Sequence, residues 1–136
     1  MCIRDRGNAN GHLILRGGKQ TNYDPQSVAE CERIMQQAGL RPTLMVDCSH
    51  ANSGKDFRRQ PEVAEVVIQQ RLAGNKSIIG LMLESHLNEG KQDADLPFSQ
   101  LKYGVSITDG CINWVSTETL LRNAHHKLSS CLTQSG

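Results

Sequence analysis

The sequence has no long hydrophobic run, no marked excess of charge of either sign and no paired-cysteine motif. No apolar stretch approaches the roughly 20 residues of a membrane-spanning helix, and none follows the charged N-terminus as in a secretory signal. The 15 basic and 14 acidic side chains leave a net charge of +1, which gives no reason to expect a nucleic acid or a membrane as partner. We expect a cytoplasmic protein, for which small phosphorylated ligands remain possible.

The five cysteines are scattered and odd in number. This pattern is typical of reduced thiols and argues against a disulfide framework or a structural zinc site. The stretch Ser53-Gly54-Lys55 lacks the upstream glycine of a phosphate-binding P-loop, so it is no nucleotide signal. With 38% hydrophobic and 21% charged residues, the 136-residue chain is suited to one folded domain.

What is present is an alternation of short apolar runs and amphipathic patterns. Three near-continuous apolar runs are expected to form strands: residues 12–16, 43–46 and 78–83. Three helices are expected from periodicity and capping residues: about 25–38, about 61–73 and about 116–128. Strands that alternate with helices of this length predict an α/β fold with βαβ units and a parallel sheet.

Each expected strand ends at a side chain that can bind a ligand: Arg16, His50 and Glu84 follow one another at intervals of 34 residues. Because the carboxyl ends of parallel strands open on one side, these three side chains are expected to share a rim. An imidazole and a carboxylate there indicate a divalent-metal site, to which Asp109 could add an oxygen. The guanidinium of Arg16 suits a phosphate or a carboxylate.

Taken singly, these residues have plainer interpretations. His50 could be a structural histidine, Arg16 a salt-bridge partner, Glu84 a surface carboxylate and Asp109 a turn residue before Gly110.

Longer motifs decide between the interpretations. Five stretches in order resemble class I 3-deoxy-D-arabino-heptulosonate-7-phosphate (DAHP) synthases, over about residues 7–128: LRGGK (15–19), DCSHANS (47–53), IIGLMLESHL (78–87), EGKQ (89–92) and YGVSITDGCINW (103–114). The resemblance implies a metal-dependent transferase that condenses phosphoenolpyruvate with erythrose 4-phosphate in the first step of the shikimate pathway. It also implies that the chain forms the sixth to eighth units of a (β/α)8 TIM barrel.

The resemblance assigns roles to the matching residues. It implies that His50, Glu84 and Asp109 bind one divalent metal ion, which could be Mn, Fe, Co or Zn. It implies that Arg16 binds the phosphoenolpyruvate anion and that His50 and Asp109 take part in catalysis. The family's fourth ligand, a cysteine of the first barrel strand, is absent from this chain, and the family pattern does not use Cys48 in its place.

A complete barrel needs about 250 residues. We therefore expect this chain to be a C-terminal fragment, inactive and poorly soluble alone, of an enzyme that forms a homo-oligomer at full length. Residues 1–6 match nothing in the family and are expected to be an artefact; residues 7–128 are expected to form the partial barrel, and 129–136 a tail.

Two alternatives remain at this point. The chain could be a non-catalytic α/β binding or interaction module derived from the barrel, which would need polar residues over its barrel-facing side. It could also belong to another metal-dependent aldolase of barrel type, which would not explain all the motifs together.

Overall fold

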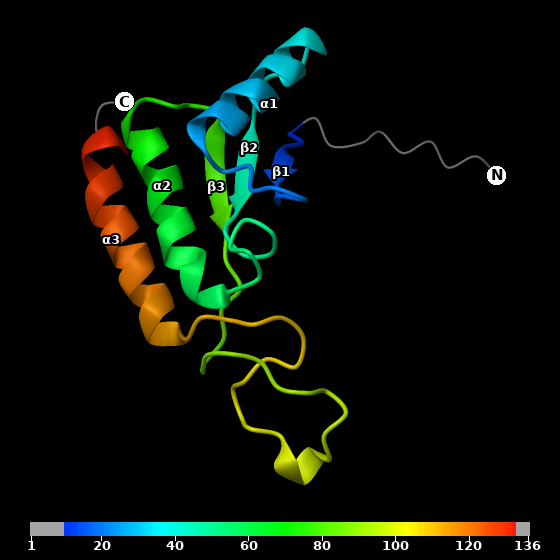
Figure 1. Ribbon diagram of the computed structural model, residues 1–136. Coiled ribbons are helices and arrows are strands. Elements are labelled where there is room, and N and C mark those ends of the chain that lie inside the picture. Colours follow the sequence, from blue (N-terminus) through cyan, green and yellow to red (C-terminus); the bar gives the residue numbers. More distant parts are fainter. Residues whose placement is uncertain (1–9, 133–136) are drawn as a thin grey trace, which may run out of the picture.

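The computed structural model describes residues 10–132, in which strands and α-helices alternate (Figure 1). The elements are β1 (Leu13–Leu15), α1 (Pro25–Gln37), β2 (Leu44–Asp47), α2 (Gln60–Leu72), β3 (Ile78–Met82) and α3 (Trp114–Leu132). Helix α3 therefore continues beyond residue 128, where the sequence predicted the start of a tail. The segment 1–6, predicted to be foreign, lies outside the described residues.

The three strands form one parallel sheet in the order β1-β2-β3. Leu15 pairs with Val46, and Val46 pairs in turn with Leu81, so equivalent points of the three strands lie side by side. The parallel sheet predicted from the sequence is confirmed, and the three strand ends lie at one edge of the sheet (Figure 1).

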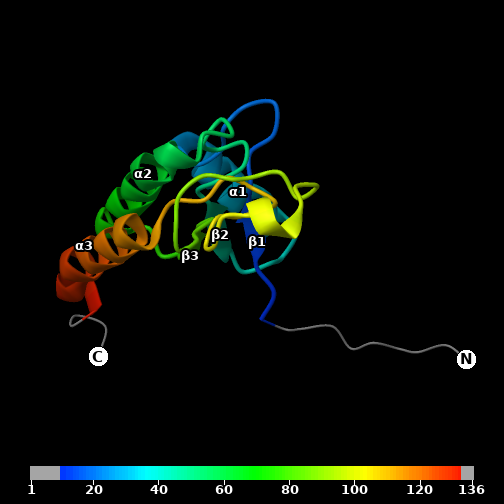
Figure 2. The ribbon, with the colours of Figure 1, turned by 90° about the horizontal axis from the view of Figure 1, so that it is seen from below.

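A hydrophobic core joins the helices to the sheet. Helices α1 and α2 share one buried cluster with the strands, made of Leu15, Val28, Met35, Leu44, Val46, Val67 and Ile78. Helix α3 packs along α2, where Leu120 joins a second cluster with Val63 and Ala64 (Figure 2). Buried apolar area of this kind is the main favourable contribution to folding.

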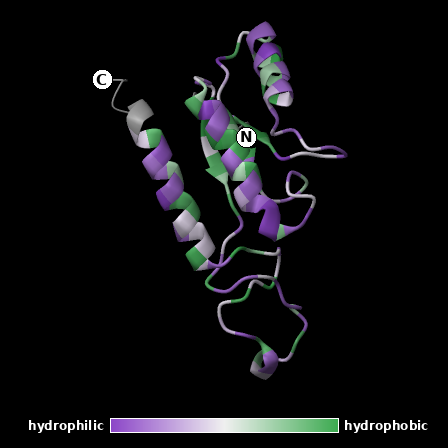
Figure 3. Cartoon of the chain, turned by 60° about the vertical axis from the view of Figure 1, so that its left-hand side comes forward, coloured by the Kyte–Doolittle hydropathy of each residue, from purple (hydrophilic) through white to green (hydrophobic). Residues whose placement is uncertain are grey.

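The outer strands are less covered than the central one. Leu44 and Val46 of β2 are fully buried, whereas Ile14 of β1 is 51% exposed and Ile79 of β3 is 57% exposed. In Figure 3 the strands are mainly green, the colour of hydrophobic residues, while purple hydrophilic segments recur along the helices. Exposed isoleucines on both outer strands leave apolar surface for which residues 10–132 provide no cover.

The start of α1 follows the sequence closely. Asp24 is its N-cap, and its carboxylate accepts hydrogen bonds from the backbone N–H of Ser27 at 2.9 Å and from the Ser27 hydroxyl at 2.6 Å. These bonds to Ser27 lower the pKa of the Asp24 carboxyl. Pro25 follows in the first turn, where its missing N–H costs nothing. The predicted cap is confirmed.

A long loop connects β3 to α3 and extends below the strand ends (Figure 1). It folds back on itself through three pairings: Ser85 with Ile112, Gly90 with Cys111 and Lys91 with Ser106. These pairings bring Asp109, near the end of the loop, back toward the sheet. Within residues 10–132, no helix is long and apolar enough to cross a membrane.

Candidate metal centre

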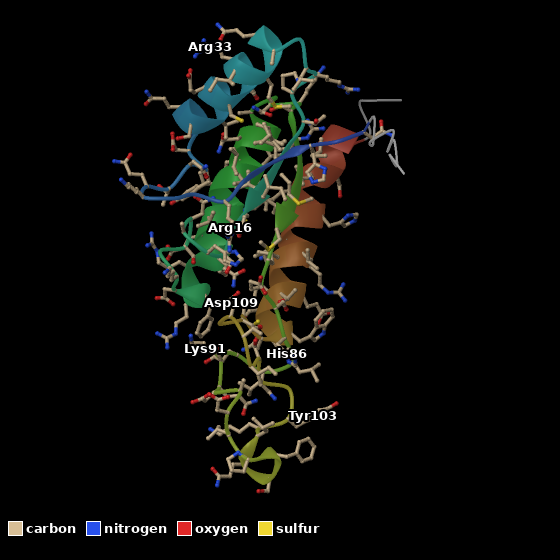
Figure 4. All side chains as sticks on the ribbon, turned by 90° about the vertical axis from the view of Figure 1, so that its right-hand side faces the viewer. Arg16, Arg33, His86, Lys91, Tyr103 and Asp109 are labelled. Atoms are coloured by element: carbon tan, nitrogen blue, oxygen red, sulfur yellow. The ribbon has the colours of Figure 1, made fainter. Side chains whose placement is uncertain are left out.

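Residues that follow the carboxyl ends of β1 and β2 line a cavity of about 770 Å³. Arg16 follows β1 directly, His50 lies three residues after β2, and both line this cavity together with Asp109. Figure 4 shows Arg16 and Asp109 at this end of the molecule, with Tyr103 farther out on the loop. Arg16 and His50 therefore share this cavity, as predicted; Glu84, the third predicted residue, does not line it and is placed beside His50 and Asp109 instead.

Three of the predicted site residues form a compact group. His50, Glu84 and Asp109 each offer one nitrogen or oxygen atom, and these atoms lie within 4.8 Å of one another. The Nε2 atom of His50 is 3.5 Å from the Oδ2 atom of Asp109. One imidazole and two carboxylates are a donor set that suits a divalent cation of the first transition series. The described residues therefore contain a possible metal site.

Asp47 determines which nitrogen of His50 faces this site. Its Oδ2 atom lies 2.7 Å from Nδ1 of His50, and its Oδ1 atom accepts the backbone N–H of Ser49 at 2.8 Å. Asp47 is fully buried, whereas the side chain of His50 is 20% exposed. A carboxylate on one ring nitrogen fixes the tautomer and the ring orientation of a metal-binding histidine. The arrangement leaves Nε2 free to face Asp109.

The backbone of His50 is also held in an unusual conformation, with φ at +31°. Positive φ is rarely adopted by residues with a side chain and is concentrated at functional sites. The carbonyl of His50 accepts the backbone N–H of Lys55 at 2.9 Å and the hydroxyl of Ser53 at 3.1 Å. These bonds stabilise the turn that directs the imidazole toward the cavity.

Arg16 lies near the group of His50, Glu84 and Asp109 without belonging to it. Its Nε atom is 3.7 Å from Oδ2 of Asp47, and its side chain is 64% exposed. The cavity is lined by further cations, namely Lys55, Arg58 and Lys91. Several positive side chains around one cavity raise the local concentration of anions and suit phosphorylated ligands.

Asn52 was not singled out from the sequence, yet it connects two strand ends. It is fully buried, and its Nδ2 atom donates to the carbonyl oxygens of Leu15 at 3.0 Å and Asp47 at 2.9 Å. Its Oδ1 atom accepts the N–H of Asn22 at 2.9 Å. Gly17 must be a glycine here, because its φ is +74° and a Cβ atom would lie 2.8 Å from Oδ1 of Asn52.

Gln60 is a second fully buried polar residue that the sequence did not reveal. It follows two arginines in the polar stretch Arg58-Arg59-Gln60, where a solvent-exposed glutamine is the natural expectation. Asn52 belongs to the SHANS motif, so its place in a family motif could have indicated a role at the site. Gln60 lies in none of the quoted motifs.

Two nearby residues stay outside the metal group. Cys48 is fully buried, and burial raises the pKa of its thiol to about 12. It is not a member of the group formed by His50, Glu84 and Asp109. The Nδ1 atom of His86 lies 2.5 Å from the carbonyl oxygen of Gly104, so this ring fastens the loop to itself.

The contact between Asp47 and His50 leads to a first prediction. We expect Asp47→Asn to weaken Mn²⁺ binding by the full-length protein about 10- to 100-fold, because the imidazole loses its anionic partner. Isothermal titration calorimetry with Mn²⁺ measures the change, and Asp95→Asn in the exposed loop is the control. Equal affinities of Asp47→Asn and the unmodified protein would show that Asp47 does not orient His50.

The chain matches the description "DAHP synthetase I family" over residues 3–122. This match begins inside the segment 1–6 for which the sequence predicted an unrelated origin. The chain is 60% identical to the Tyr-sensitive phospho-2-dehydro-3-deoxyheptonate aldolase of Enterobacter agglomerans and 59% identical to that of Escherichia coli (strain K12). Each comparison covers 96% of this chain, and respectively 62% and 37% of the relative, so the chain spans less than two thirds of the length of either relative.

The structure gives the same relationship. It is similar to the phospho-2-dehydro-3-deoxyheptonate aldolase of Francisella tularensis SCHU S4, with a TM-score of 0.84 and 35% identity. That comparison covers 90% of this chain and 36% of the relative. Sequence and fold agree over most of the described residues, and the chain belongs to the DAHP synthetase I family.

Proposed function

We propose that the full-length protein is a DAHP synthase, which condenses phosphoenolpyruvate with erythrose 4-phosphate in the first step of the shikimate pathway. The observation that carries the proposal is the convergence of His50, Glu84 and Asp109 in a chain that matches the family over residues 3–122. Family membership supports the reaction, and the three converging side chains support the site at which it takes place.

We further propose that residues 7–128 form the sixth to eighth units of a (β/α)8 barrel. The parallel sheet has open edges at β1 and β3, and Ile14 and Ile79 on those strands are about half exposed. Further barrel strands would pair with these edges and cover this apolar surface. The same exposed isoleucines argue against an independent binding module, which would need polar residues there.

Different residues of the site have different roles in the proposed reaction. A divalent metal ion bound by His50, Glu84 and Asp109 would supply Lewis-acid polarisation of the sugar aldehyde. Arg16 binds the anionic groups of phosphoenolpyruvate and holds the molecule with its carbon 3 facing the aldehyde. Carbon 3 attacks the aldehyde carbon, water adds at carbon 2, and inorganic phosphate leaves with cleavage of the carbon–oxygen bond.

The donor set limits the metal to a few divalent ions but does not identify which of them is bound. One imidazole nitrogen and two carboxylate oxygens suit Mn²⁺, Fe²⁺, Co²⁺ and Zn²⁺. The neighbouring Asp47 keeps the histidine ring oriented in the absence of substrate, so that the site is pre-organised.

The full-length protein should form the seven-carbon phosphate product and release inorganic phosphate when given both substrates. Treatment with a chelator should reduce the rate about 1,000-fold, because Lewis-acid stabilisation is worth several kcal/mol and each ~1.4 kcal/mol is a factor of ten. Addition of Mn²⁺, Fe²⁺, Co²⁺ or Zn²⁺ should restore it. If the full-length protein formed no product with each of these four ions in turn, the proposed function would be refuted.

The relatives also favour one regulator. The chain is 59% identical to the Tyr-sensitive relative of Escherichia coli (strain K12) and 48% identical to the Phe-sensitive relative of the same organism. We infer that tyrosine rather than phenylalanine inhibits the full-length protein. The same assay decides the question, since phenylalanine as the stronger inhibitor would contradict the inference.

A further inference from the structure

Gln60 makes a pair of hydrogen bonds with the backbone of a metal-site residue. Its Oε1 atom accepts the N–H of Glu84 at 2.8 Å, and its Nε2 atom donates to the carbonyl oxygen of Glu84 at 3.0 Å. The side chain of Gln60 is fully buried at the start of α2 and does not line the cavity. Any influence that it has on the site must therefore pass through Glu84.

Glu84 needs such a partner because it lies beyond the end of the sheet ladder. The last paired residues of β2 and β3 are Asp47 and Met82, and the final backbone bond of this ladder runs from the N–H of Cys48 to the carbonyl of Met82. Beyond this point β2 turns away into the segment that carries His50. The amide of Gln60 presents one donor and one acceptor to Glu84, as the peptide groups of a neighbouring strand would.

A second contact holds Glu84 from the loop. The backbone N–H of Ile112 donates to the carbonyl oxygen of Glu84 at 3.0 Å, in addition to the bond from Gln60. Gln60 itself is firmly placed, because Pro61 follows it and Val63 and Ala64 of the same helix are buried in the core. The backbone of Glu84 is thus fixed between a helix start and the returning loop.

We propose that Gln60 is a positioning residue that places the Glu84 carboxylate for metal binding; this inference rests on the proposed metal site. The position of the Glu84 backbone limits where its flexible side chain can place an oxygen near His50 and Asp109. Without the amide of Gln60, the N–H of Glu84 loses its partner, its carbonyl keeps only the bond from Ile112, and the strand end can shift. A displaced carboxylate binds the ion less tightly even though every ligand remains present.

The experiment compares two glutamines of α2 in the full-length protein. Gln60→Met removes both hydrogen bonds with little change in volume, whereas Gln60→Glu keeps the shape and the acceptor for the N–H of Glu84. Gln70→Met is the matched control, because Nε2 of Gln70 donates to the carbonyl of Tyr23 at 2.7 Å, outside the metal site. Electron paramagnetic resonance measures the affinity for Mn²⁺ alone, and thermal unfolding of the metal-free proteins measures stability.

We expect both Gln60 variants to bind Mn²⁺ more weakly, Gln60→Met by about 10- to 100-fold, while Gln70→Met binds it as the unmodified protein does. Both methionine variants should lower the unfolding temperature of the metal-free protein. Unchanged affinity in a folded Gln60 variant, or an equal loss in Gln70→Met, would overturn the positioning role. If the unmodified protein binds no Mn²⁺, the metal site and this inference both fail. If it binds Mn²⁺ and the Gln60 variants bind the ion with the same affinity, only this inference is overturned.

Discussion

The variant Glu84→Gln should reduce the turnover of the full-length protein about 1,000-fold, because it removes one of the two anionic ligands proposed for the metal with little change in side-chain volume. Loss of Lewis-acid assistance worth several kcal/mol corresponds to a loss of this size, at ~1.4 kcal/mol for each factor of ten. The backbone bonds between Glu84 and Gln60 do not depend on the carboxylate, so the fold should persist. Steady-state kinetics at saturating substrate and metal measures the effect.

The control for this variant is Glu89→Gln, which removes an exposed carboxylate from the same loop. Glu89 contacts Asn113 at 3.5 Å and is not a member of the metal group, so this variant should keep its activity. Circular dichroism of both variants tests whether the fold is kept. A Glu84→Gln protein with turnover equal to that of Glu89→Gln would show that Glu84 is not a ligand in catalysis.

The variant Asn52→Asp should destabilise the full-length protein by about 3–5 kcal/mol at pH 7, the usual cost of an unpaired buried charge. Nδ2 of Asn52 donates to the carbonyl oxygens of Leu15 and Asp47, so a carboxylate at this position would face two acceptors without any water. Urea unfolding at pH 7 measures the loss. Asn123→Asp on the exposed side of α3 is the control and should have little effect.

The destabilisation by Asn52→Asp should depend on pH in a defined direction. Burial beside two carbonyl oxygens raises the pKa of the new carboxyl in the folded state above its value of about 3.9 in the unfolded state. A carboxyl whose pKa is raised in the folded state lowers the free energy of unfolding as the pH rises from the unfolded-state pKa to the folded-state pKa. The deficit should therefore be largest at neutral pH and become smaller in acid. A deficit that grows in acid relative to the unmodified protein would contradict the position described for Asn52.

The parts of the fold that the sequence predicted are those with a local physical cause. The parallel sheet follows from short apolar runs separated by helical patterns, and the start of α1 follows from the adjacent residues Asp24 and Pro25. The convergence of His50 and Glu84 follows from their position at the ends of parallel strands. Each of these inferences needs only neighbouring residues and the geometry of a regular fold.

The parts that could not be predicted depend on contacts between distant segments. Asn52 and Gln60 are of residue types that are mostly exposed, and only the folded chain shows that they satisfy backbone groups at the ends of the strands. The path of the loop that returns Asp109 to His50 depends on pairings between residues 15 to 27 positions apart, which leave no periodic pattern. The end of α3 was placed too early because the apolar pattern stops at Leu128, whereas the helix continues to Leu132.

The metal site is tested most directly by anomalous diffraction from crystals of the full-length protein soaked in Zn²⁺. A single strong peak about 2.0–2.2 Å from Nε2 of His50 and from one carboxylate oxygen each of Glu84 and Asp109 is the expected result. Such a peak would show that the three converging side chains bind the ion. Zn²⁺ bound at other residues, or three side chains without a peak between them, would contradict the site and the reaction proposed for it.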